Sequence, residues 1–346
     1  METTLRPVRV RLRAVLVALL ALVATPAVAG DSAVIVLYHR FGENLYPTTN
    51  IRLEQFEAHL KELKSGGYTV LPLGEIVAAF AEGRALPDRT VAITIDDAVA
   101  SVYTRAWPRL KQAGLPFTLF VSTEAHDQRF KDYMTWDQIR ELKAAGVTIG
   151  NHTVTHGHMV DATPEENAAE IEKSNARFKA ELGEAPTLFA YPYGEYANAP
   201  RAVAEKAGFK AAFGQHSGVA YAGADRFTLP RFALNEHWGE IGRFREIANA
   251  LPLPITVAEP GDTRVTQPNP PPFALTVSPD VGPLTKFACY GPSRTTTNID
   301  EDRHTAKASF AQPFALGRNR VNCTMPGPDG RWRWWGVQFY VPRKVL

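Results

Sequence analysis

The stretch Val91–Asp97, VAITIDD, decides the fold prediction, because an apolar run ends there abruptly in two adjacent carboxylates. A short apolar run rich in β-branched residues is typical of a buried strand. Consecutive side chains of a strand point to opposite faces, so Asp96 and Asp97 can serve one site only where the strand ends. The carboxyl ends of strands are also where α/β folds place their reactive groups. The two acids are therefore candidate active-site residues.

Apolar runs that predict strands alternate with segments of helical spacing from residue 33 to residue 213. Several of the predicted helices end at a glycine, and the longest begins with the capping sequence TPEE at residues 163–166. Such alternation predicts a parallel sheet with helical crossovers. The number of units fits a full or deformed β/α barrel better than an open sheet, although the pattern alone leaves both open.

The composition changes near residue 252, and seven prolines fall between residues 252 and 272. Proline at this density blocks helices and regular central strands, so we expect an extended linker over residues 252–272. Short β-type runs follow, and they predict a small all-β module over residues 273–346. The α/β unit is then expected over residues 30–251.

The N-terminus has the pattern of a secretory signal peptide over residues 1–29. Four arginines precede the apolar run at residues 14–24, and the small residues PAVA at 26–29 offer a cleavage site. The apolar run is short for a membrane span. We therefore expect an exported protein, periplasmic or secreted, without a stable membrane span after cleavage. An uncleaved N-terminal anchor is the alternative.

Charge and cysteine content narrow the classes further. The chain has 346 residues and a formal net charge of +2, which falls to −1 without residues 1–29. This near-neutral balance gives no electrostatic basis for binding nucleic acid. The two cysteines, Cys289 and Cys323, indicate a disulfide in an exported protein, and two buried free thiols are the alternative.

His152 and His156 form a second conspicuous pair, separated by four positions. The β-branched run between them disfavours a helix, and flanking glycines predict a tight loop after a short strand. Two imidazoles and one carboxylate are a common catalytic metal set that leaves one position open. An H-x-x-x-H pair is a weak signal alone, and adjacent acids can simply cap a helix. The conjunction of the two pairs favours a metal site.

Three motifs, in this order, resemble those of the polysaccharide deacetylases, also called carbohydrate esterase family four. Residues 94–98, TIDDA, are similar to the family's T-F-D-D-G motif, and residues 152–156, HTVTH, to its H-[ST]-x-x-H motif. Residues 190–194, AYPYG, resemble its R-x-P-Y motif. The resemblance covers roughly residues 33–250, and the chain is most similar to the biofilm poly-N-acetylglucosamine deacetylases.

The resemblance implies a deformed β/α barrel, the catalytic domain, that removes N-acetyl or O-acetyl groups from glycans. It implies a divalent metal ion, most often zinc, and Asp96 as the general base. The residues that it assigns to the metal are Asp97, His152 and His156. The third motif is expected to contribute to substrate binding through Tyr191, Pro192 and Tyr193, although core packing is the default role of buried aromatic residues.

Several positions depart from the family pattern. Ala98 replaces a glycine, and Ala190 replaces the arginine of the third motif, which puts that arginine's salt bridge in doubt. We find no late L-x-H motif to supply a general acid. The resemblance to the biofilm enzymes implies that His39, at the end of the first predicted strand, is the general acid. A purely structural histidine is the alternative. His216 and His237 are the other candidates for the general acid.

Arg231, in the sequence LPR at residues 229–231, can orient Asp96 through a bidentate pair. An ordinary surface or interdomain arginine is the alternative. In the β module, the tryptophans of RWRWW at residues 331–335 either bind sugar rings or pack on one face of a strand.

We therefore expect an exported, metal-dependent hydrolase acting on the carbon–nitrogen bond of an acetylated polysaccharide. A poly-β-1,6-N-acetylglucosamine-like polymer is the first expected substrate. Peptidoglycan, chitin oligomers and acetylated xylan are the alternatives. A different class remains open, which is a catalytically silent glycan-binding or assembly protein that keeps the barrel.

Overall fold

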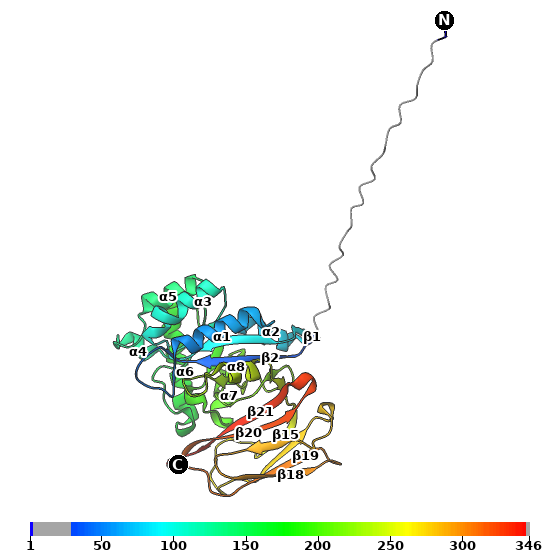
Figure 1. The fold of residues 1–346 in the computed structure, drawn as a ribbon. Helices are drawn as coiled ribbons and strands as arrows, with labels where there is room; N and C mark the ends of the chain where they lie inside the picture. The colour runs from blue at the N-terminus through cyan, green and yellow to red at the C-terminus, as the bar shows by residue number, and fades with distance from the viewer. Residues whose placement is uncertain (3–28, 344–346) are drawn as a thin grey trace.

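The computed structural model describes residues 1–2 and 29–343 (Figure 1). The expected signal peptide, residues 1–29, lies almost entirely outside the described residues. Within the described part, no helix is long and apolar enough to cross a membrane.

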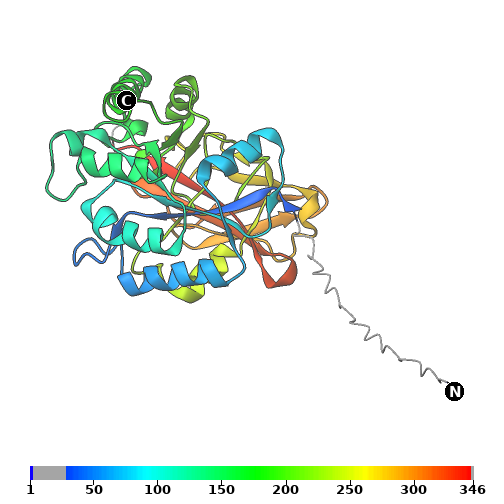
Figure 2. The same cartoon turned by 90° about the horizontal axis from the view of Figure 1, so that it is seen from above.

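A curled, mostly parallel sheet forms the centre of the first unit (Figures 1 and 2). Its main path runs in the order β11-β10-β9-β8-β7-β2. Two short strands extend it: β5 (Thr69–Val70) pairs with β7, and β12 (Ala220–Tyr221) pairs with β2. The strands of the main path are β2 (Ser32–Tyr38), β7 (Thr90–Ile95), β8 (Thr118–Val121), β9 (Thr148–Asn151), β10 (Leu188–Ala190) and β11 (Ala211–Phe213).

A short segment joins the two edges of this sheet. Strand β13 (Phe232–Ala233) pairs in parallel with β2, and Leu229, just before it, forms a parallel bridge to Phe213 of β11. Residues 229–233 therefore close the curled sheet into a deformed barrel, which confirms the predicted fold class. The carboxyl ends of β2, β7, β8 and β9 consequently lie along one rim.

Helices cover the outside of the barrel (Figure 2). Helix α1 buries Phe56, Leu60 and Leu63, the residues at helical spacing in the sequence. Helix α6 begins with the expected capping box, in which Thr163 and Glu166 satisfy each other's backbone N–H groups. The helices are α1 (Leu53–Ser65), α2 (Leu73–Glu82), α3 (Trp107–Ala113), α4 (Thr123–Asp127), α5 (Trp136–Ala144), α6 (Pro164–Leu182), α7 (Asn198–Lys206) and α8 (Ile241–Ala248).

The C-terminal module consists of two four-stranded sheets with their own core, which includes Leu275, Val321 and Phe339. The first sheet has the order β14-β21-β20-β17 and the second β15-β16-β19-β18. Their strands are β14 (Leu251–Pro252), β15 (Ile255–Glu259), β16 (Phe273–Val277), β17 (Ala288–Tyr290), β18 (Thr295–Asp300), β19 (Thr305–Phe310), β20 (Gly317–Pro326) and β21 (Trp332–Val341).

Strand β15 corrects the predicted linker, because it lies inside residues 252–272 and pairs with β16. Its sequence, ITVAE, contains no proline, whereas Pro254 and Pro260 flank it. It also occupies the edge of its sheet, where neighbouring prolines remove no ladder hydrogen bond. The all-β module therefore begins earlier than its composition indicates.

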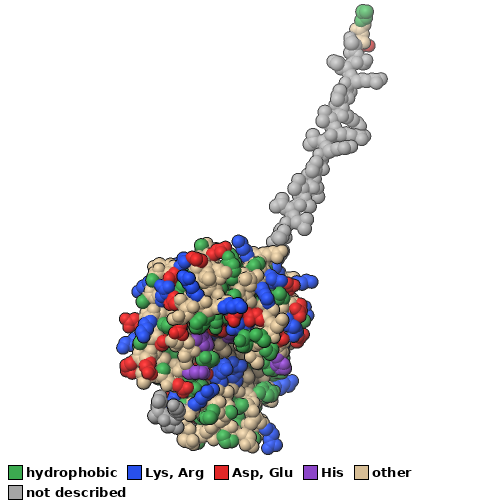
Figure 3. Space-filling model, turned by 90° about the vertical axis from the view of Figure 1, so that its left-hand side faces the viewer, with side chains coloured by type: hydrophobic (Ala, Val, Ile, Leu, Met, Phe, Trp, Pro, Cys, Tyr) green, Lys and Arg blue, Asp and Glu red, His purple; other side chains and the backbone are tan. Residues whose placement is uncertain are grey.

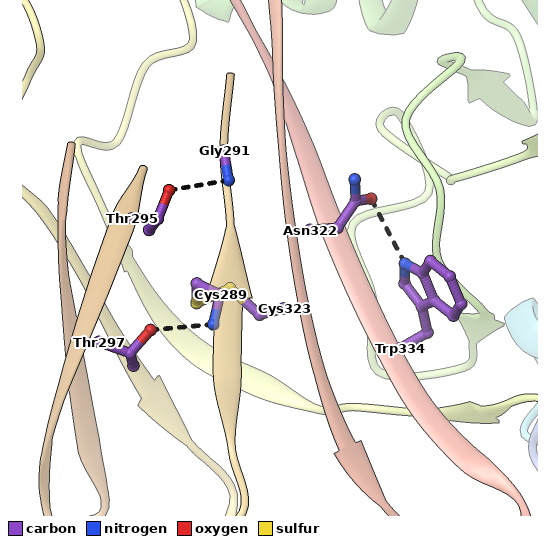
Figure 4. The surroundings of a disulfide bond; sticks show 7 residues. All are labelled: Cys289, Gly291, Thr295, Thr297, Asn322, Cys323 and Trp334. Atoms are coloured by element: carbon purple, nitrogen blue, oxygen red, sulfur yellow. Dashed lines mark hydrogen bonds between the residues drawn. A yellow bond between two sulfur atoms is a disulfide. The ribbon is translucent and has the colours of Figure 1, made fainter. Parts of the chain in front are cut away.

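Cys289 and Cys323 form a disulfide between adjacent strands β17 and β20, 34 residues apart in sequence (Figure 4). The Cys289 N–H donates a hydrogen bond of 3.0 Å to Thr297 Oγ1, which belongs to β18 of the other sheet (Figure 4). The bridged pair therefore lies where the two sheets meet.

The β20–β21 hairpin has one face in the module core and the other against the barrel. Trp334 packs edge-to-face on Phe232 of β13 with 5.3 Å between ring centroids, whereas Trp335 faces the module core. Trp332 is 40% exposed. The tryptophans thus divide among different surroundings instead of forming one sugar-binding platform, and the module is fixed to the barrel beside β13.

Candidate active site

The candidate catalytic residues follow the ends of three parallel strands. His39 follows β2, Asp96 and Asp97 follow β7, and His152 follows β9. The backbone turns sharply there, with positive φ at Asp97 (73°) and His156 (57°). A left-handed backbone costs a non-glycine residue about 1–2 kcal/mol, and such strain gathers at functional sites. Because the strands end at these turns, adjacent side chains no longer point to opposite faces and can converge on one point.

Asp97, His152 and His156 bring three possible ligand atoms within 4.8 Å of one another. Asp97 Oδ1 lies 3.6 Å from His152 Nε2 and 3.5 Å from His156 Nε2. The structure therefore brings together the three residues predicted from the two sequence motifs.

The orientation of His152 tests whether this set fits a metal ion. Its Nδ1 lies 2.6 Å from the Ala190 carbonyl oxygen, so Nδ1 carries the proton and donates it there. Nε2 then carries no proton and has a free lone pair. It is buried without a hydrogen-bond partner among the described residues. A fixed imidazole lone pair beside a second imidazole and a carboxylate fits a divalent cation such as zinc.

Asp96 forms a fully buried bidentate pair with Arg231. Arg231 Nη1 donates to Asp96 Oδ1 at 2.7 Å and Nη2 donates to Oδ2 at 2.8 Å. Burial would raise the pKa of Asp96, but the charge and hydrogen bonds of Arg231, together with His152 and His39, outweigh burial and hold the pKa at about 2. Asp96 is therefore a carboxylate at neutral pH, and its Oδ2 lies 3.9 Å from His152 Nε2.

The position of Arg231 follows from the closure of the barrel. It lies on the segment 229–233 and is 0% exposed, so it is not a surface arginine. Its Nε donates to the Gly214 carbonyl at 2.8 Å, which fixes the guanidinium plane. Asp96 therefore has a cationic partner in Arg231, even though Ala190 replaces the arginine of the third motif.

His39 is partly exposed on the same rim. Burial lowers its pKa, while the charges of Asp97 and Asp96 act in the opposite direction. The rivals lie in different surroundings. His216 is 4% exposed, and burial lowers its pKa to about 3, with Arg320 and Arg231 acting in the same direction. His237 packs against Trp238, with 4.3 Å between ring centroids.

The third motif contributes one residue to the surface of the site. Tyr191 is fully buried and its hydroxyl donates to the Phe227 carbonyl at 3.0 Å, so the expected substrate contact is corrected to core packing. Pro192 is also buried. Tyr193 is half-buried, and its ring lies edge-on to His156 with 4.5 Å between centroids.

Sequence reasoning missed a polar group behind Tyr193. The Tyr193 ring stacks on His158 with 4.1 Å between centroids, and His158 Nδ1 lies 2.7 Å from the buried Glu195 carboxylate. From the C-terminal module, Gln338 Nε2 donates to the Tyr193 carbonyl at 3.1 Å. The sequence offered one weak signal for this group, which is the polar Gln338 between apolar residues of a β-type run, and it does not show what Gln338 contacts. One face of the molecule has a hollow where histidines lie beside basic side chains (Figure 3).

Residues 83–212 match the family model described as Polysaccharide deacetylase. This segment is similar to the polysaccharide deacetylases. All three sequence motifs lie within the match, whereas His39 and Arg231 lie outside it.

Several characterised or named proteins are similar to this chain at low sequence identity. A Bacillus subtilis (strain 168) protein whose name assigns it to the polysaccharide deacetylases is 27% identical over 201 residues, 58% of this chain and 71% of that protein. The poly-beta-1,6-N-acetyl-D-glucosamine N-deacetylase of Escherichia coli (strain K12) is 25% identical over 259 residues, 62% of this chain. That alignment covers 37% of the Escherichia coli enzyme, so this chain matches little more than a third of it.

Among solved structures, IcaB from Ammonifex degensii is similar with a TM-score of 0.57 and 26% sequence identity. The similarity covers 64% of this chain and 98% of that chain. More than a third of this chain therefore has no counterpart in that structure.

Proposed function

We propose that this chain is a metal-dependent deacetylase of an acetylated polysaccharide. The observation that carries the proposal is the convergence of Asp97, His152 and His156 next to the ionised Asp96. The domain match and the relatives' names support an N-acetylglucosamine polymer of the poly-β-1,6 type as first substrate. Peptidoglycan, chitin oligomers and acetylated xylan come second. The N-terminal pattern and the disulfide support an exported location.

Each group has a distinct task in this proposal. A divalent ion held by Asp97, His152 and His156, with zinc as first choice, would supply Lewis acidity toward the acetyl carbonyl and acidify a water. Asp96 accepts the proton of the attacking water, because Arg231 keeps it ionised and oriented. His39 delivers a proton to the leaving amine from the same rim. The Tyr193 ring, which packs against His156, forms one side of the substrate site.

A silent glycan-binding protein is the alternative of another class, and the geometry disfavours it. Sugar binding alone requires neither an imidazole nitrogen buried without a partner nor a carboxylate held ionised inside the barrel. Both features cost stability unless a reaction or a metal uses them.

The test of the proposal is acetate release from N-acetylglucosamine oligomers of β-1,6 and β-1,4 linkage. Release is expected from metal-loaded protein, and treatment with a chelator should reduce it to background because the ligand set loses its ion. Adding zinc back should restore it. A metal-loaded, folded protein that releases no acetate from any N- or O-acetylated glycan would overturn the proposal.

Replacing His39 by alanine should slow amide deacetylation by about 100-fold, because an amine leaves poorly without a proton. An aryl acetate ester provides the matched control, since its phenolate leaves without protonation. The variant should therefore retain most of its activity on the ester. A wild-type rate on N-acetylglucosamine oligomers would exclude His39 as the general acid.

A further inference from the structure

The β20 strand places two arginines beside the candidate active site. Arg318 and Arg320 occupy alternate positions and so share a face of the strand. They are paired across the ladder with Tyr340 and Gln338 of β21. This is the face of the hairpin that meets the barrel, and not the face in the module core.

A short chain of contacts connects these arginines to the metal-ligand set. Arg320 Nε donates to Gln338 Oε1 at 3.0 Å, and Gln338 in turn holds the Tyr193 carbonyl. The Arg318 guanidinium lies 5.6 Å from the Tyr193 ring, the ring that packs against His156. The module therefore contributes one wall of the site that the barrel begins.

The charge of Arg320 has no counter-ion in the part of the chain that the structure describes. Among residues 29–343 it forms no ion pair, whereas Arg318 lies 3.7 Å from Glu195. Arg320 is exposed to solvent, yet burial and the neighbouring Arg318 lower its pKa to about 10. Its side chain therefore reaches water, while the neighbouring protein groups partly desolvate the guanidinium.

The free part of Arg320 has a defined shape. Gln338 occupies the Nε–H, which leaves the edge formed by Nη1 and Nη2. Two parallel N–H bonds on that edge match the two oxygens of one carboxylate. Because the guanidinium is partly desolvated and has no counter-ion among the described residues, such an edge favours an anionic partner.

We propose that Arg320, supported by Arg318, forms a subsite for a carboxylate carried by the acetylated glycan. This inference rests on the proposed function and narrows its substrate to a polysaccharide in which an acidic sugar neighbours the acetylated one. The subsite would position the chain through the acidic sugar while the acetyl group meets the metal-ligand set.

The test compares two oligosaccharides of equal length, one neutral and one with a uronic acid next to N-acetylglucosamine. Calorimetric binding and KM are measured for wild type, Arg320→Gln and Arg303→Gln. Arg303 is the matched control, because its side chain is 81% exposed and lies in the hairpin between β18 and β19. Wild type and Arg303→Gln should prefer the acidic oligosaccharide by about tenfold, and Arg320→Gln should lose that preference while still binding the neutral one.

The outcomes separate the two proposals. Equal binding of both oligosaccharides by wild type, or an unchanged preference in folded Arg320→Gln, overturns the subsite. Preference that depends on Arg320 without acetate release from any glycan supports the subsite and removes the deacetylase function. Acetate itself is the second source of a carboxylate. If acetate inhibits the enzyme only when Arg320 is present, and neither oligosaccharide is preferred, then Arg320 binds the acetate product. That result would overturn the assignment of Arg320 to a substrate carboxylate.

Discussion

Asp96→Asn should reduce acetate release by roughly 10²–10⁴-fold. The amide has nearly the shape of the carboxylate but cannot accept a proton from the attacking water. Metal binding should persist, because the three ligand residues are unchanged. The measurement is single-turnover acetate release from an N-acetylglucosamine oligomer, with metal content determined on the same sample.

Folding must be checked in this variant, because Arg231 then lacks its counter-charge in the barrel. Asp96→Glu provides the companion variant, since it keeps the charge and moves the carboxylate by one methylene. We expect Asp96→Glu to fold and to remain impaired, because the base is displaced from the ligand set. A folded, metal-loaded Asp96→Asn protein with the wild-type rate would remove Asp96 from the mechanism.

Arg231→Met should lower the free energy of unfolding by about 3–5 kcal/mol, because it leaves a buried carboxylate without its partner. Both side chains of this pair are 0% exposed, so solvent does not screen the loss. Activity should fall as well, since the pKa of Asp96 rises when burial acts alone. The measurements are urea unfolding and the pH dependence of kcat/KM.

The pH dependence of this loss has a definite sign. In wild type the pKa of Asp96 lies at about 2, below its ordinary value of 3.8. The pair therefore stabilises the fold fully above pH 3.8, and this stabilisation is lost as the pH falls toward 2. In Arg231→Met the pKa is raised, so ionisation destabilises the fold as pH rises. The stability difference between the two proteins should therefore grow from acidic to neutral pH. A difference that is independent of pH would contradict the pairing.

The double variant Asp96→Leu/Arg231→Met separates stability from catalysis. Replacing a buried ion pair by apolar residues of similar volume is often neutral or stabilising. We expect the double variant to recover most of the stability lost in Arg231→Met and to remain inactive. Recovery of activity along with stability would show that the pair has only a structural role.

The sequence was sufficient for the barrel because its strands and helices carry strong local signals. The run at residues 91–95 is buried along its whole length as β7, and the capping box at Thr163 begins α6. The closing strand β13 is two residues long and has no periodicity to detect. Strand β15 was hidden by the prolines around it, because composition averages over a window larger than the strand.

The same distinction applies to the site. Asp97, His152 and His156 lie in motifs whose spacing carries information, and the structure places them together. Arg231 was found as a candidate but not distinguished from a surface arginine, because its burial depends on the closure of the barrel. Tyr191 was assigned to the substrate because the motif does not show which of its two tyrosines the fold buries. Arg320 and Gln338 could not be placed, because no local pattern reports how two units dock.

Strand β21 packs into the module core with one face and contacts the barrel with the other. Val337 and Phe339 fill the module core, while Gln338, between them, holds the backbone of Tyr193. A one-residue shift would move each side chain of the strand to the opposite face. Insertion or deletion of one residue here would therefore turn Gln338 into the module and present its apolar neighbours to the barrel. Natural variation along β21 should consequently consist of substitutions at constant length, even in the part of the chain that lies outside the family match.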